Sequence, residues 1–211
     1  MKIDTSNAVQ ILLLVGGMSL VPALLFVVTG FSRILVVLGF IRTAMGTQTS
    51  PPNQVLVGIA LFLTLFVMMP TVTAIKNDAW DPLEHHQIST TQAITRAEQP
   101  LRQFMFRQTN IDELSLFVSL SHIKAPSTEG QIPTYVLVPA FIMSEMKTAF
   151  EIGFLIFLPF LIIDLIVSST LMSMGMIMLP PTFISLPFKI LLFVLVNGWD
   201  LIARALVASF H

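Results

Sequence analysis

The residues of this sequence that could carry chemistry are charged side chains placed inside apolar stretches. Glu145, Lys147 and Glu151 lie in SEMKTAFE (144–151), and Asp164 stands alone among the apolar residues of FLIIDLIVSS. Carboxylates inside membrane segments often relay protons, because an ionised group there is costly and usually serves a function. An ion pair or a hydrogen bond to a neighbouring helix is the plainer role, and the pattern favours it. A proton relay stays open as the alternative.

Two further charges, Arg33 and Lys189, interrupt the first and the last apolar stretch. An ionised side chain at the bilayer centre costs at least about 2.5–3.5 kcal/mol, so such residues normally face protein or water. Lys147 and Glu151 are four residues apart and can pair on one helix face. The other charged residues need partners elsewhere, and we expect them to pair between subunits of an assembly: Arg33, Glu145, Asp164 and Lys189.

Four methionines occupy alternate positions in LMSMGMIMLPP (171–181): Met172, Met174, Met176 and Met178. Alternate positions scatter round a helix. Gly175 weakens a helix and two prolines end one, so we predict a loop. Thioether side chains adapt to varied partners. Converging from several identical subunits, they would form a soft collar that holds back water and ions but yields to an unfolded chain. Ordinary apolar filler is the alternative, and the run by itself favours it.

The composition excludes several classes of function. The chain is 55% hydrophobic and 11% charged, with a mean hydropathy of +0.84. Soluble domains carry about 25% charged residues, so this is a membrane-class protein. A net charge of −1 gives no support for a nucleic-acid partner. Without cysteine there is no disulfide or thiolate site. We read the adjacent His85 and His86 as a solvated loop and not as a metal site. The sequence has no GxSxG, HExxH or Walker A pattern, so we expect neither an enzyme nor a cofactor.

The elements that position these residues are helical. Apolar stretches run over residues 8–41, 55–75, 135–171 and 184–208, on either side of a polar middle. We predict an all-α protein in three parts: a first hairpin of apolar helices (1–75), a helical extramembrane domain (76–134), and apolar helices with the methionine loop (135–211). The start is read as a retained first helix, or as a mature chain whose leader was left off. Hydropathy alone predicts four membrane spans, although the charges argue against a simple lipid-facing bundle.

The third apolar stretch is too long for one span. As a continuous helix it would extend about 50 Å, against about 30 Å for a bilayer core. We therefore predict breaks at Pro139 and Pro159. In the polar middle, TTQAITRAEQPLRQFMFRQT (90–109) has one apolar face at helical spacing. We expect Asp112 to cap the helix that follows.

Several segments together resemble the FliP family, the P subunit of the flagellar type III protein export gate. They are PPNQVL, ALFLTLFVMMP, QPLRQFMFRQT, the block from Ser144 to Pro181, and LPFKILLFVLVNGWDLIARALVASF. The resemblance runs from about Leu25 to Phe210.

This resemblance implies a protein-conducting gate and not a catalyst. Five copies would assemble with FliQ and a single FliR into a helical ring complex in the inner membrane of the flagellar basal body. Part of the gate would lie on the periplasmic side, near FlhB and the MS ring protein FliF, and unfolded export substrates would pass through it. The four methionines would line the constriction. Residues that support ring formation in the family map onto Phe104, Phe117 and Glu145.

Two other functions remain open from the sequence. An ion-coupled transporter would use Asp164 and Glu151 and would work as a single protein. A structural scaffold for the basal body would make no substrate contact at the methionine loop.

Overall fold

The structure is a computed structural model that describes residues 26–47, 49–123, 126, 128–176 and 178–210. All regular secondary structure in these residues is helical, which confirms the all-α prediction. The expected first helix from residue 8 lies largely outside the described residues. The longer helices are α2 (Phe31–Ala44), α3 (Asn53–Ile75), α5 (Thr90–Gln108), α6 (Ile111–Leu120), α7 (Thr134–Ser173), α8 (Pro181–Leu195) and α9 (Gly198–Ala208).

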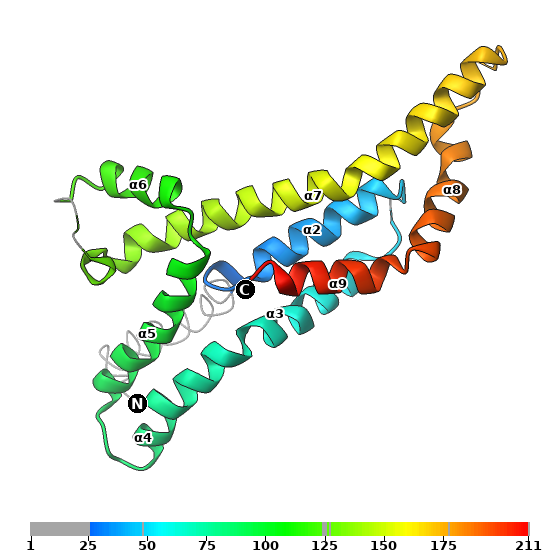
Figure 1. Cartoon of the computed structure of the whole chain (residues 1–211). Helices are drawn as coiled ribbons and strands as arrows, with labels where there is room; N and C mark the ends of the chain where they lie inside the picture. The colour runs from blue at the N-terminus through cyan, green and yellow to red at the C-terminus, as the bar shows by residue number, and fades with distance from the viewer. Residues whose placement is uncertain (1–25, 48, 124–125, 127, 177, 211) are drawn as a thin grey trace, which may run out of the picture.

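Helix α2 lies at the centre of the molecule. It packs along the middle of α7 on one side and against α3 on the other, with α9 close by (Figure 1). Its fully buried residues Ile34, Val37, Leu38 and Ile41 follow helical spacing and form the centre of the core. This stripe packs α2 against α7 and α3.

Helix α3 matches the predicted span but does not end where the polar residues begin. A five-residue π-helical stretch (Lys76–Trp80) and the short α4 (Asp81–Glu84) continue it into one 32-residue helix. In the described residues, two helices are long and apolar enough to cross a membrane, Asn53–Glu84 and Thr134–Ser173. Taking α8 and α9, which meet at a 65° bend, as one broken span would make three.

Helix α7 is a single 40-residue helix that passes through Pro139 and Pro159. The predicted breaks are therefore wrong. At 1.5 Å per residue the helix extends about 60 Å. Each proline removes one backbone hydrogen bond, but the neighbouring turns continue the ladder. Packing against α2 and α6 then outweighs the local preference. Prolines inside apolar membrane helices are tolerated for related reasons.

Beyond α4, the polar middle contains two longer helices, α5 and α6, joined by a sharp turn. Ser89 and Gln92 form a reciprocal capping box at the start of α5, and the predicted apolar face of α5 is buried at Ala93, Phe104 and Met105. The cap of α6 is Asn110 and not Asp112, which lies in the first turn. The backbone N–H of Asn110 donates to Ser144 Oγ at 2.9 Å, so the turn is fixed to α7.

Candidate functional site: the α7–α8 tip and the ion pairs behind it

The α7–α8 tip, residues Met172–Leu179, is closed by a specific turn. The N–H of Met176 bonds to the carbonyl of Leu171, and the N–H of Gly175 bonds to that of Met172, each at 3.0 Å. This pair of bonds is a Schellman motif, and Gly175 takes the left-handed conformation that it needs, with φ of +74°. The predicted loop is thus present at residues 174–176 and 178–180. Met172 lies in the last turn of α7, so for this residue the loop prediction is wrong.

The methionine side chains of the tip are largely exposed. Met172 is 65%, Met174 64% and Met178 97% exposed, whereas Met176 is half-buried. The tip is one end of the elongated α7–α8 pair and projects away from the core around α2 (Figure 1). In the part of the chain that the structure describes, no other element covers it. Exposed apolar surface of this kind is typical of an interaction site.

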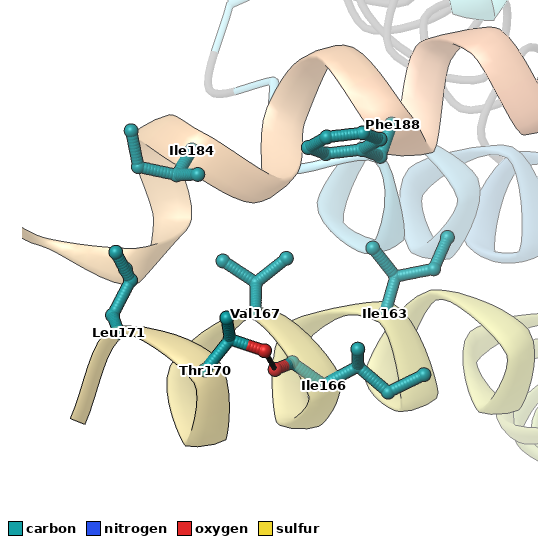
Figure 2. Close-up of a pocket in the computed structure, with 7 residues that line it drawn as sticks. All are labelled: Ile163, Ile166, Val167, Thr170, Leu171, Ile184 and Phe188. Atoms are coloured by element: carbon teal, nitrogen blue, oxygen red, sulfur yellow. Dashed lines mark hydrogen bonds between the residues drawn. The ribbon is translucent and has the colours of Figure 1, made fainter. Parts of the chain in front are cut away.

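An apolar pocket of about 420 Å³ lies between α7 and α8 next to the tip (Figure 2). Ile163 and Val167 of α7 face Ile184 and Phe188 of α8 across it. The hydroxyl of Thr170 donates to the carbonyl of Ile166 at 2.8 Å, so the helix itself satisfies that polar group. The two helices are therefore not packed tightly together directly behind the tip.

An ion pair between the half-buried Asp164 and the buried Lys189 joins α7 to α8 beyond this pocket. Lys189 Nζ donates to Asp164 Oδ2 at 2.6 Å, and Ser185 Oγ donates to Asp164 Oδ1 at 2.6 Å. Ser185 and Lys189 are both buried. Both carboxylate oxygens of Asp164 are thus occupied, and the pair holds the base of the tip together.

A second ion pair forms a buried node around Arg33, which is 2% exposed. Its guanidinium binds both carboxylate oxygens of Glu145, with Nε 3.0 Å from Oε2. It also donates to the carbonyl of Ser209 at 2.7 Å and to Gln108 Oε1 at 3.0 Å. The Phe210 ring centroid lies 4.0 Å from the guanidinium carbon. One side chain on α2 therefore joins α5, α7 and the residues after α9; we call this the Arg33 node.

Comparison with known proteins identifies the family. The model of the FliP family matches residues 14–206. The flagellar biosynthetic protein FliP of Bacillus subtilis is 52% identical over 207 residues, which cover 98% of this chain and 94% of that protein. Those of Pectobacterium carotovorum and Caulobacter vibrioides are 50% and 52% identical, over 97% and 98% of this chain and 79% and 78% of their own length. The chain belongs to the FliP family.

Membership of the FliP family makes the chain a component of the flagellar export apparatus. The family is not enzymatic, in agreement with the prediction from the sequence. Helices long and apolar enough to cross a membrane fit a membrane-embedded flagellar component.

The ion pairs of this FliP-family chain differ from the sequence-based expectation. We expected pairs between subunits, but the structure forms Arg33–Glu145 and Asp164–Lys189 within one chain. The expected local pair of Lys147 with Glu151 is not formed. Lys147 Nζ donates instead to Glu113 Oε1 on α6, at 3.1 Å, and Glu151 is exposed. A lysine four residues before a glutamate is the less favourable order on a helix, and the packing of α6 on α7 supplies another acceptor.

Phe104 and Phe117, which the resemblance assigns to ring formation, lie in different surroundings. Phe104 is buried, and its ring lies edge-on to Phe141, with centroids 5.9 Å apart. Phe117 is half-buried on α6. Sequence reasoning missed three contributors to the Arg33 node: Gln108, Ser209 and Phe210. No local pattern marks them, because a glutamine and a serine near helix ends are ordinary surface residues.

Proposed function

We propose that this chain is a core subunit of the flagellar type III protein export gate, through which unfolded flagellar proteins pass. In this proposal five copies assemble with FliQ and FliR round one channel. The gate belongs to the basal body in the inner membrane, partly on the periplasmic side, and lies near FlhB and the MS ring protein FliF. In this proposal the methionine tip acts as a seal of the channel. Membership of the FliP family supports a place in the export apparatus, and the exposed methionines of the tip support the seal.

The exposed methionine tip is the observation that carries the proposal. Three flexible thioether side chains stand at the remote end of a 40-residue helix, where a monomer leaves them in contact with solvent or lipid. If copies stand round one axis, the tips of identical subunits meet. Unbranched side chains can then repack round a passing chain and close again behind it. The apolar pocket behind the tip leaves room for such movement.

The surroundings of Asp164 make an ion-coupled transporter the weaker alternative. A carboxylate that carries protons or ions must be free to change its partners, whereas both oxygens of Asp164 are held, by Lys189 and by Ser185. We propose that this residue instead keeps α8 in place against α7.

In this proposal, residues support ring formation in two ways: by fixing the shape of the subunit or by contacting a neighbouring subunit. Phe104 and Glu145 are buried within the chain, so they act by fixing the shape of the subunit. Phe117, half-buried on α6, and the exposed residue Glu151 can contact a neighbouring subunit directly.

Substitution of Met178 tests the seal. With 97% of its surface exposed, Met178 makes few contacts in the monomer, so Met178→Ala should change the stability of the subunit by less than about 0.5 kcal/mol. The ion conductance of membranes that contain the assembled complex should rise at least several-fold. Met143→Ala is the matched control, because Met143 is also exposed but lies on α7 far from the tip. Equal conductance of the Met178→Ala, Met143→Ala and unaltered complexes would contradict the seal.

A further inference from the structure

A groove lies between α3, α5 and the residues that follow α9. It has a volume of about 530 Å³, within the range of small-molecule sites. Val67 and Pro70 of α3, Phe104 of α5 and Phe210 form its apolar walls. One wall of the groove is α3, which belongs to a helix long and apolar enough to cross a membrane.

Among the described residues, Arg107 is the one cationic residue that lines this groove. It is exposed in the last turn of α5, and it makes no hydrogen bond or ion pair with the residues that the structure describes. Arg102, five residues earlier on the same helix, differs sharply, since it donates to Thr134 and to the carbonyl of Ile132. Arg107 is therefore available to an anion.

Besides Arg107, the polar residues that line the groove are Thr71, Gln108 and Ser209, and the last two are already engaged. Gln108 accepts a hydrogen bond from Arg33 and donates one to the carbonyl of Phe210, at 3.0 Å each. The carbonyl of Ser209 accepts from Arg33. A ligand of this groove would thus find apolar walls, a glutamine and a serine carbonyl that are already bonded, the side chain of Thr71, and one free guanidinium at the end of α5.

We propose that the groove binds an anionic phospholipid. The phosphate lies on Arg107, and part of an acyl chain lies along Val67, Pro70 and Phe104. A guanidinium can bind a phosphate with two parallel hydrogen bonds, and basic pockets beside membrane helices hold anionic headgroups. An apolar segment of a second copy fits less well, because it would cover the walls and leave Arg107 without an anion. The bound lipid would also touch Phe210 and so cover the Arg33 node.

Native mass spectrometry of the delipidated full chain in a neutral detergent tests this site. Phosphatidylglycerol and phosphatidylcholine would be added separately, and bound lipid counted per chain. We expect one phosphatidylglycerol to bind at least tenfold more tightly than phosphatidylcholine. Arg107→Gln should abolish this preference, and Pro70→Phe should weaken binding by filling the groove without a change of charge. Arg96→Gln is the control, since Arg96 is also exposed on α5 but does not line the groove.

Four results would overturn the proposal. The first is equal binding of the two lipids. The second is an equal loss of binding in Arg96→Gln and Arg107→Gln, which would show a general effect of charge. The third is full displacement of the lipid by glycerol phosphate at the same concentration, because then the phosphate alone would be recognised. The fourth is a cross-link between two copies. If a short amine-reactive cross-linker joins residue 107 of the Arg107→Lys variant to a second copy while the protein is saturated with lipid, the groove is an interface between copies and not a lipid site.

Discussion

The Arg33 node and the α7–α8 tip are opposites within one chain. At the node, a charged side chain that is costly to bury has all its partners inside the molecule, from α5, α7 and the residues after α9. At the tip, apolar side chains that would normally be covered are exposed. The charged side chain of the node has its partners within the single chain, whereas the methionine side chains of the tip are left exposed by the single chain.

In the proposed gate, this difference separates what the chain needs in order to fold from what the assembled complex needs in order to close. A buried charge without a partner is strongly unfavourable, so the node must form when the chain folds. An exposed methionine turn costs the fold little, and only contacts outside the chain can cover it. The ion pair of Asp164 with Lys189 lies between the two regions and connects the two helices, α7 and α8, that the tip joins.

The largest effect is expected at the node. Glu145→Ala would leave the Arg33 guanidinium buried without its carboxylate, and breaking a buried pair in this way costs about 3–5 kcal/mol. We expect a much lower midpoint of thermal unfolding in detergent and little folded subunit. The double variant Arg33→Met with Glu145→Leu should recover part of the loss, because it removes both charges.

A different outcome would show that Glu145 acts in assembly and not in folding of the single chain. If Glu145→Ala left the melting temperature of the monomer unchanged but prevented assembly, Glu145 would act between subunits and the account of a self-contained node would be wrong.

A smaller effect is expected at the base of the tip. Asp164→Asn would leave the Lys189 ammonium, 5% exposed, without its carboxylate, while Asp164 itself is 32% exposed. Because water can partly replace the lost contact, we expect a loss of stability of about 1–3 kcal/mol. Protease accessibility of the 171–181 segment should rise before the rest of the chain unfolds. Ser185→Ala, which removes only the second donor to Asp164, should have a weaker effect of the same kind. Equal protease accessibility of this segment in the unaltered, Asp164→Asn and Ser185→Ala proteins would show that this pair does not position α8.

The sequence predicted the helices because their signals are local. The apolar run of α3, the amphipathic face of α5 and the turn signals at Gly175 and Pro180 are each read within a few residues. The predicted breaks in α7 failed because they depended on tertiary packing. Pro139 and Pro159 disfavour a continuous helix locally, but α7 packs along α2 and does not break.

The site was harder to predict than the fold, because its contacts join residues far apart in the chain. Arg33 and Glu145 are separated by 112 positions, and Arg33 and Ser209 by 176. The sequence showed that the charges needed partners but not that the same chain supplies them. For Lys147, the nearby Glu151 was the obvious choice, and only the packing of α6 on α7 brings Glu113 within 3.1 Å. The methionine tip was found from the sequence because its pattern is contiguous.

Cysteine cross-linking at the tip tests the central claim most directly. The chain has no cysteine of its own, so Met178→Cys introduces a single reactive thiol. In the complex co-expressed with FliQ and FliR, a short bis-maleimide should join copies of the chain through this position. Val37→Cys, fully buried beside the node, should give no product. Cross-linked copies in the Met178→Cys protein and none in the Val37→Cys protein is the predicted result. If the thiol of the Met178→Cys protein reacts with a monofunctional maleimide yet never joins two copies, the tips do not meet, and the account of an incomplete tip completed by its neighbours is wrong.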